Sequence, residues 1–218
     1  MIARKPPTIT TGDILLFEVN NQQHNQSQLK DFLNFLKFCG KRGSLKFNHI
    51  EEKATLIKGL TLKENILLDT GIEITRDSDL FKILENRGQS YLCQLAKKIT
   101  NLNLYPNEVD IETKKIAALI KTLASEAEYI LLEKPEKYLS KANTELFLAA
   151  LFQSMTQRKQ ILLLTSEKRN LWLSHISKVV TRSETGRFTL DAVLGKDDIL
   201  NHGHLEFSMN SQTLKKAA

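Results

Sequence analysis

Residues 129–140 read Tyr-Ile-Leu-Leu-Glu-Lys-Pro-Glu-Lys-Tyr-Leu-Ser, an apolar run of four followed by charged residues and a proline. A short aliphatic run that ends at a turn signal predicts a buried β-strand. Two further runs have the same character, at 14–19 and at 161–164. None of them alternates apolar with polar side chains, so each strand is expected to be covered on both faces. Such strands are typical of a parallel sheet in an α/β protein.

Amphipathic helices separate these strands. Apolar residues recur at helical spacing from 29 to 36, with Ser27 as the N-cap and a stop near Gly40. The other predicted elements of the sheet and its cover are helices at 111–124 and 141–156, an edge strand at 43–48, and a strand around 179–180 followed by a turn at 184–186. Trp172 is expected to pack against the sheet.

One block of the chain departs from this alternation. Residues 60–105 predict helices at 61–68, 78–87 and 90–100, interrupted at Gly71, Gly88 and the turn at 105–107, and they predict no strand. We interpret the block as a helical insertion in a single domain spanning 1–200, whose core is 12–59 and 106–195. Residues 196–218 are polar and weakly patterned, and they predict a C-terminal tail.

Composition narrows the function classes. The 218 residues carry 31 Lys and Arg against 25 Asp and Glu, which gives a net charge of +6. Hydrophobic residues make up 41% and charged residues 26%, as in ordinary globular proteins. No apolar run approaches the roughly 18 residues that a membrane helix needs, and no signal peptide is visible. The two cysteines have no paired spacing, which favours the cytoplasm over an oxidising compartment.

Six segments resemble, in order and spacing, the ATPase subunits of ABC transporters. Residues 59–66, Gly-Leu-Thr-Leu-Lys-Glu-Asn-Ile, are similar to that family's G-L-T-V-x-E-N-I, and 129–140 resemble I-L-L-L-D-E-P-T-x-x-L-D. The remaining matches are 12–27 to the first strand and Walker A loop, 40–48 to the following strand, 105–123 to the signature helix, and 160–167 to the strand that ends at the switch histidine. Together they cover about 12–190.

The resemblance implies a fold. It is a P-loop NTPase-like α/β domain with a mostly parallel sheet covered by helices, and the block at 60–105 corresponds to the family's helical insertion. The antiparallel part that precedes the Walker A strand in the family would be truncated here, because few residues stand before position 12.

The same alignment implies that the nucleotide-contacting positions are changed. The loop at 19–27 lacks the glycines that let a backbone approach phosphate, and Asn25 replaces the Walker A lysine. Ser27 remains, and Glu133 replaces the Walker B aspartate, so these two are the weak candidates for holding Mg-ATP. Lys134 stands where the family has the glutamate that polarises water, and a cation cannot accept that proton.

Three further motifs are altered. Ser140 replaces the D-loop aspartate and Ser166 the switch histidine. The signature motif becomes Val-Asp-Ile-Glu-Thr at 109–113, which places Asp110 and Glu112 at a helix N-terminus, where carboxylates suit the helix dipole but repel a triphosphate. No Q-loop glutamine stands at 55–59. We therefore expect a pseudo-ATPase with no catalytic residues, no cofactor and no metal.

The remaining candidate sites, a histidine pair and three pairs of basic residues, are weak indications of function. His202 and His204 are a weak metal pair in the polar tail. The basic pairs at 41–42, 97–98 and 114–115 are interpreted as solvated surface, and no aromatic platform for nucleic acid accompanies them.

The function hypothesis follows from the resemblance. We expect a non-catalytic ABC-ATPase-like subunit that is a structural or regulatory partner in an ABC-type membrane complex. Its partner would be a permease-like subunit or a second ATPase-like subunit, and it would lie in the cytoplasm, peripheral to the membrane, without inserting. The alternative is a soluble adaptor or regulator, conceivably nucleic-acid-associated, that reuses the fold. A third hypothesis is unconventional ATP binding through Ser27 and Glu133.

Overall fold

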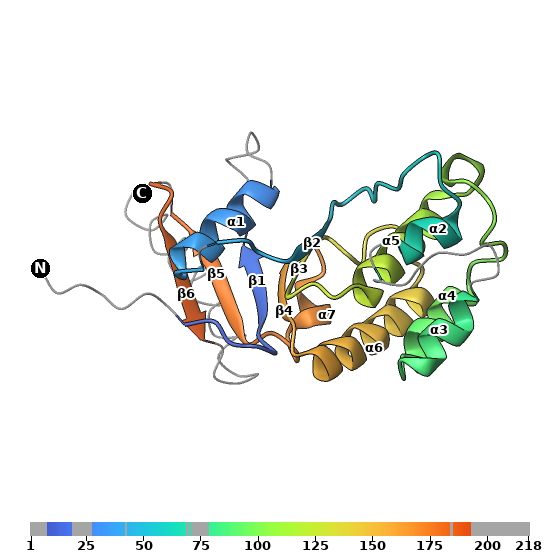
Figure 1. The fold of residues 1–218 in the computed structure, drawn as a ribbon. Coiled ribbons are helices and arrows are strands. Elements are labelled where there is room, and N and C mark those ends of the chain that lie inside the picture. The colour runs from blue at the N-terminus through green and yellow to red at the C-terminus, as the bar shows by residue number, and fades with distance from the viewer. Residues whose placement is uncertain are drawn as a thin grey trace, which may run out of the picture.

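The computed structural model describes residues 8–18, 28–41, 43–68, 70, 79–183 and 185–192. Its centre is a six-stranded sheet in the order β2-β3-β4-β1-β5-β6 (Figure 1). The strands are β1 Ile14–Glu18, β2 Phe47–Ile50, β3 Tyr129–Glu133, β4 Ile161–Thr165, β5 Lys178–Arg182 and β6 Phe188–Ala192. All neighbours pair in parallel except β5 and β6, which are antiparallel. The expected α/β fold with a mostly parallel sheet is confirmed.

The aliphatic strands divide their side chains between two cores. On β3, Ile130 and Leu132 face one hydrophobic cluster, and Tyr129 and Leu131 face the other. Strands β1 and β4 alternate in the same way, since successive side chains of a strand point to opposite faces. A strand covered on both faces has no position for a polar side chain, which explains the unbroken apolar runs.

Helix α1, Gln28–Phe38, covers one face of the sheet with buried Phe32, Phe35 and Leu36. It ends as predicted at Gly40, whose φ of 79° is unfavourable for residues with a side chain. The backbone N–H of Gly40 donates to Lys37 and that of Lys41 to Leu36, which is a Schellman motif. The predicted N-cap Ser27 lies outside the described residues.

Helices α5, Ile111–Ala124, and α6, Lys141–Arg158, cover the opposite face. The sequence predicts the bounds of α5 and the start of α6. Trp172, in the short helix α7 at Arg169–Trp172, is completely buried on this face. Its ring meets that of Phe147 from α6 edge-on, with centroids 6.4 Å apart, so its predicted packing is confirmed.

The described residues of the block at 60–105 form helices joined by turns and contain no strand. It holds α2 Leu62–Leu67, α3 Leu80–Asn86 and α4 Ser90–Ala96, and the 3₁₀ turn η1 Pro106–Glu108 follows it. Thr61 and Glu64 form a capping box that starts α2. The buried Asn65 side chain accepts a hydrogen bond from the Ile57 N–H through Oδ1 and donates one to the Ile57 carbonyl through Nδ2. These two bonds fasten the preceding loop to α2. Figure 1 shows this block beside α5 and α6, away from α1.

The structure corrects several predicted bounds. The strand expected at 43–48 is β2, Phe47–Ile50, although its edge position is right. The helix expected at 90–100 ends at Ala96, and the one expected at 78–87 begins at Leu80. Strand β6 and helix α7 were not predicted. Gly71, the tail at 196–218 and its two histidines lie outside the described residues.

Strand β6 had a readable signal. Phe188 and Leu190 are half-buried against the α1 core, and the alternate residues Thr189 and Asp191 are exposed. This alternation is the signature of an edge strand with one covered face. Within the described residues, no helix has the length and apolar character needed to cross a membrane.

We expect Phe35→Ala to lower the free energy of unfolding by about 3–5 kcal/mol, because it leaves a cavity in the α1 core. The Phe35 ring is fully buried and meets Phe17 and Phe188 edge-on, with centroids 5.2 and 5.6 Å away. The matched control is Phe38→Ala, one turn later on the same helix, where the ring is 43% exposed. Urea denaturation should show a loss below about 1 kcal/mol there. Equal losses for the two variants would contradict this packing.

Candidate functional site

The carboxyl ends of three parallel strands meet at one edge of the sheet. In the register, Ile50 of β2 lies beside Leu132 of β3, and Glu133 lies beside Thr165 of β4. The residues that follow therefore converge, and they are charged: Glu51, Glu52, Glu133, Lys134 and Glu167. Ligands of open α/β sheets bind at this edge. We take it as the candidate site.

Glu133 has a partner on the neighbouring strand. Its Oε1 lies 2.8 Å from Nε2 of His49 on β2, and the two side chains are only 19% and 12% exposed. A half-buried carboxylate needs such a partner, since burying an unpaired charge is costly. His49 was not singled out from the sequence. It stands one residue before the end of an edge strand, and its proximity to Glu133 depends on the β2–β3 register.

Lys134 is held on both its backbone and its side chain. Its φ of 42° is in the left-handed region, and its N–H donates to the Thr165 carbonyl at 2.9 Å. Its Nζ lies 2.8 Å from Glu52 Oε2 and 2.5 Å from Glu167 Oε1. The cation predicted at this position is therefore neutralised by carboxylates that follow β2 and β4.

Lys137 completes the network. Its Nζ pairs with Glu52 and lies 3.7 Å from Glu167 Oε1. Hydrogen bonds from Lys134 and Lys137 lower the pKa of Glu52 to about 2, and the bonds to Glu167 and Glu52 raise the pKa of Lys134 above its usual range. We call Glu52, Lys134, Lys137 and Glu167 the charged network.

A buried lysine lies behind this network. Lys115 of α5 is only 1% exposed, and its Nζ donates to the backbone carbonyls of Glu51 at 3.1 Å and Glu52 at 2.9 Å. The Glu133 carbonyl is 3.5 Å from the same Nζ. Burial lowers the pKa of Lys115 to about 8, against the attraction of Glu136, Glu133 and Glu52. The interpretation of residues 114–115 as solvated surface is thus wrong for Lys115, which ties α5 to the ends of β2 and β3.

Ser166 shapes the loop after β4. Its Oγ donates to Oε1 of Glu136 at 2.5 Å, and the backbone N–H groups of Glu167 and Lys168 donate to the same oxygen. Glu136 is buried, and its Oε2 has no hydrogen-bond partner. This carboxylate, also missed from the sequence, organises the loop that presents Glu167 to Lys134.

Ser140 belongs to a separate cluster with the signature-like residues. It is the N-cap of α6, and its N–H donates to Glu112 Oε1 at 2.6 Å. Asn143 donates to the same oxygen at 2.7 Å. Asp110 is the N-cap of α5 and accepts from the Thr113 N–H at 2.7 Å. The prediction that Asp110 and Glu112 lie at a helix N-terminus is confirmed, and their hydrogen bonds lower the pKa of both carboxyls.

The structure brings some predicted positions together and leaves others untested. Glu133, Lys134 and Ser166 meet at the carboxyl edge, and Ser140 joins Glu112. Asn25 and Ser27, with the rest of the loop at 19–27, lie outside the described residues. Among the described residues, no group of three or more His, Cys, Asp or Glu side chains is placed to hold a metal ion.

Comparison with known proteins identifies the fold. No protein-family model matches the chain, and no curated protein matches its sequence. Solved structures do match. One is described as the ATP-binding subunit of an ABC transporter, with a TM-score of 0.65 and 15% identity over 90% of this chain and 84% of that one. Another is an inward-facing ABC transporter assigned to the metal-chelate type, with a TM-score of 0.59 and 15% identity over 88% and 75% of the two chains. The chain has the ABC-ATPase fold.

We expect Glu52→Gln to remove acid-sensitive stability. The folded-state pKa of about 2 lies below the ordinary value of 4.5, so Glu52 stabilises the fold above pH 4.5 and loses this effect as pH falls toward 2. Because its side chain is 31% exposed, solvent screening reduces the effect to about 1 kcal/mol. Urea denaturation from pH 7 to pH 2 should show the difference between wild type and variant vanish at the acid end.

The matched control for this change is Glu51→Gln. Glu51 is the preceding residue, is exposed, and belongs to no ion pair among the described residues. A pH-independent loss for Glu52→Gln, or an equal loss for Glu51→Gln, would contradict the network.

Proposed function

We propose that this chain is a non-catalytic subunit of an ABC-type membrane complex, in which the ABC-ATPase fold is a structural or regulatory partner without ATP hydrolysis of its own. The observation that carries the proposal is Lys134, held between Glu52 and Glu167 at the carboxyl end of β3. The resemblance places the water-polarising glutamate of ABC ATPases at this position.

Two properties of the edge argue against catalysis. A general base needs a free lone pair, and the raised pKa of Lys134 keeps its amine protonated. Glu133, the acid at the Walker B-like position, already contacts His49. Of the other described carboxylates at this edge, Glu52 and Glu167 pair with lysines.

The edge also fits Mg-ATP poorly. Magnesium in such sites is held by one or two carboxylates together with substrate phosphates. Here the acid at the Walker B-like position, Glu133, contacts His49, and the carboxylates of Glu52 and Glu167 are committed to Lys134 and Lys137. Opening the charged network to admit a metal would leave two half-exposed cations beside it.

A partner in the membrane is supported by the neighbours and by the surface. Both reported neighbours are described as parts of ABC transporters. Among the described residues of the helical block at 60–105, three large apolar side chains are exposed at 43–44% of their surface: Leu68, Tyr91 and Tyr105. Singly exposed apolar side chains are ordinary on a protein surface, whereas a contiguous patch of them marks a contact surface. We propose that a cytoplasmic segment of a permease-like subunit covers them.

The experiment is capture of the tagged full chain from detergent-solubilised membranes of its native source, with bound chains identified by mass spectrometry. The expected result is a multispanning membrane protein in an amount comparable to the bait. A double variant Leu68→Ser and Tyr105→Ser should lose most of that partner. The matched control Phe38→Ser changes an equally exposed ring on α1, outside the block, and should retain it.

Two outcomes would contradict the proposal. If the bait is recovered alone or only with proteins that do not span the membrane, the adaptor alternative is favoured. Retention of the membrane partner by the double variant would move the contact away from the helical block.

A further inference from the structure

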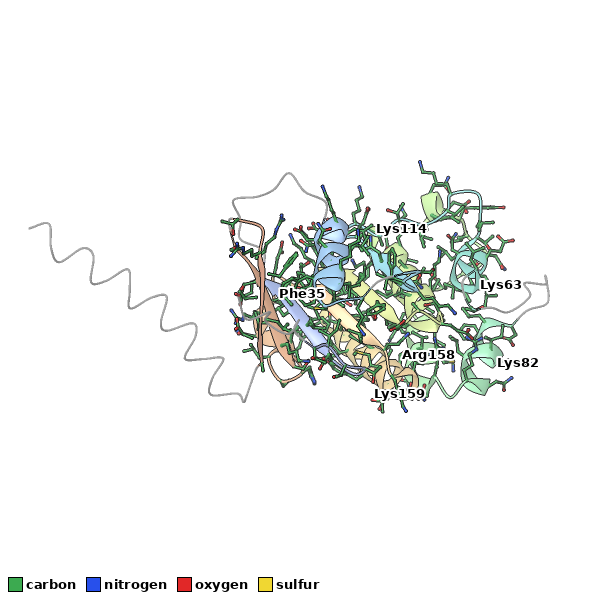
Figure 2. All side chains as sticks on the ribbon, turned by 60° about the vertical axis from the view of Figure 1, so that its left-hand side comes forward. Phe35, Lys63, Lys82, Lys114, Arg158 and Lys159 are labelled. Carbon is green, nitrogen blue, oxygen red and sulfur yellow. The ribbon has the colours of Figure 1, made fainter. Side chains whose placement is uncertain are left out.

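A hollow of about 810 Å³ opens at the amino ends of β3 and β4, opposite to the carboxyl edge described above. It lies where β3 and β4 begin and where α5 and α6 end, and α3 of the helical block closes one side. Its lining is rich in charge and in amides: Arg87, Glu126, Glu128, Gln157, Arg158, Lys159 and Gln160, with Ala127 between the two acids. Figure 2 labels Arg158 and Lys159, which follow each other at the end of α6.

Two guanidiniums are fixed beside one another in this hollow. Arg87, the C-cap of α3, donates to the Ala124 carbonyl at 3.1 Å and to the Thr70 carbonyl at 2.8 Å. Arg158 donates to the carbonyl of Ser125, which follows Ala124 in the chain. Because these two carbonyls are consecutive at the end of α5, the two cations are held close together.

This closeness has an electrostatic cost. Burial lowers the pKa of Arg158, and repulsion from Arg87 lowers it further, more than Glu126 raises it. No described carboxylate lies within ion-pair distance of Arg87, Arg158 or Lys159. The C-terminus of a helix carries a partial negative charge that attracts cations. This charge is too small to balance two guanidiniums.

Lys159 adds a third cation at the rim. It is exposed, and it ends α6 with a φ of 53°, a left-handed conformation that is uncommon for residues with a side chain. Glu126 and Glu128 are also exposed and line the same hollow, so they weaken any attraction for an anion. Affinity should accordingly be modest.

We propose that this hollow binds a phosphate group, held by the guanidiniums of Arg87 and Arg158 and assisted by Lys159. Each guanidinium keeps N–H donors beyond those that reach the backbone, and planar pairs of such donors match phosphate oxygens. An anion between the two cations would relieve their repulsion. Since Arg87 comes from the helical block and Arg158 from the core, the ligand would also brace the junction between them.

The test is thermal unfolding of the full chain in increasing sodium phosphate, with ionic strength held constant by sodium chloride. The midpoint should rise and saturate in the millimolar range. Lys159→Gln should raise the half-saturating concentration about three- to fivefold, the loss of a partly exposed charge. Glu126→Gln should lower it by a similar factor, and Arg158→Gln should abolish saturation.

The control is Lys82→Gln, which removes one positive charge from an exposed site on α3 that does not line the hollow. It should titrate as wild type does. An equal rise in all variants is the general stabilising effect of phosphate on folded proteins and would overturn the proposal. So would the absence of any rise beyond that in chloride.

A parallel titration with glycerol phosphate distinguishes the source of the group. Tighter binding than inorganic phosphate, lost in Arg158→Gln, identifies an organic phosphomonoester as the ligand. Equal or weaker binding, with the same loss, identifies free phosphate. If Arg158→Gln does not fold, the proposal is still tested by the opposite shifts in half-saturating concentration expected for Lys159→Gln and Glu126→Gln, which change exposed side chains.

Discussion

The structure depends on the burial of both faces of its central strands. Each of β1, β3 and β4 sends alternate aliphatic side chains into two separate cores, so a helix layer must cover each side. Aligning the strands in parallel then brings their carboxyl ends to one edge and their amino ends to the other. Neither edge can be covered by the helices, because the helices lie on the faces. The charged network and the hollow lined by Arg87 and Arg158 therefore lie at strand ends, where the chain leaves the apolar layer.

At the carboxyl edge, most of the charged side chains are paired within the protein, although Oε2 of the buried Glu136 has no hydrogen-bond partner. Lys134 and Lys137 are neutralised by Glu52 and Glu167, Glu133 is paired with His49, and Lys115 binds backbone carbonyls from behind. In an ABC ATPase this edge is expected to keep acids available for magnesium and water. An edge that satisfies its own charges stabilises the fold without a ligand. That difference links the retained fold to the proposed role as a non-catalytic partner.

The strands and long helices could be predicted because their signals are local. The bounds of α5 and the start of α6 follow from helical periodicity and the N-cap residues Asp110 and Ser140. The partners at the site could not be predicted, because they depend on register between distant segments. His49 meets Glu133 only because β2 pairs with β3, and the sequence does not distinguish the buried Lys115 from the half-buried Lys114 beside it. Strand β6 was not predicted, although the half-buried Phe188 and Leu190 alternate with the exposed Thr189 and Asp191.

The most direct test of the account is ATP hydrolysis by the purified wild-type chain with magnesium, compared with Glu133→Gln. The account predicts phosphate release no faster than the buffer blank, and no difference between the two proteins. It also predicts that Lys134→Glu, which restores only one acid, remains inactive. Turnover by the wild-type chain that Glu133→Gln abolishes would show that the carboxyl edge is a working catalytic site and would contradict the central claim.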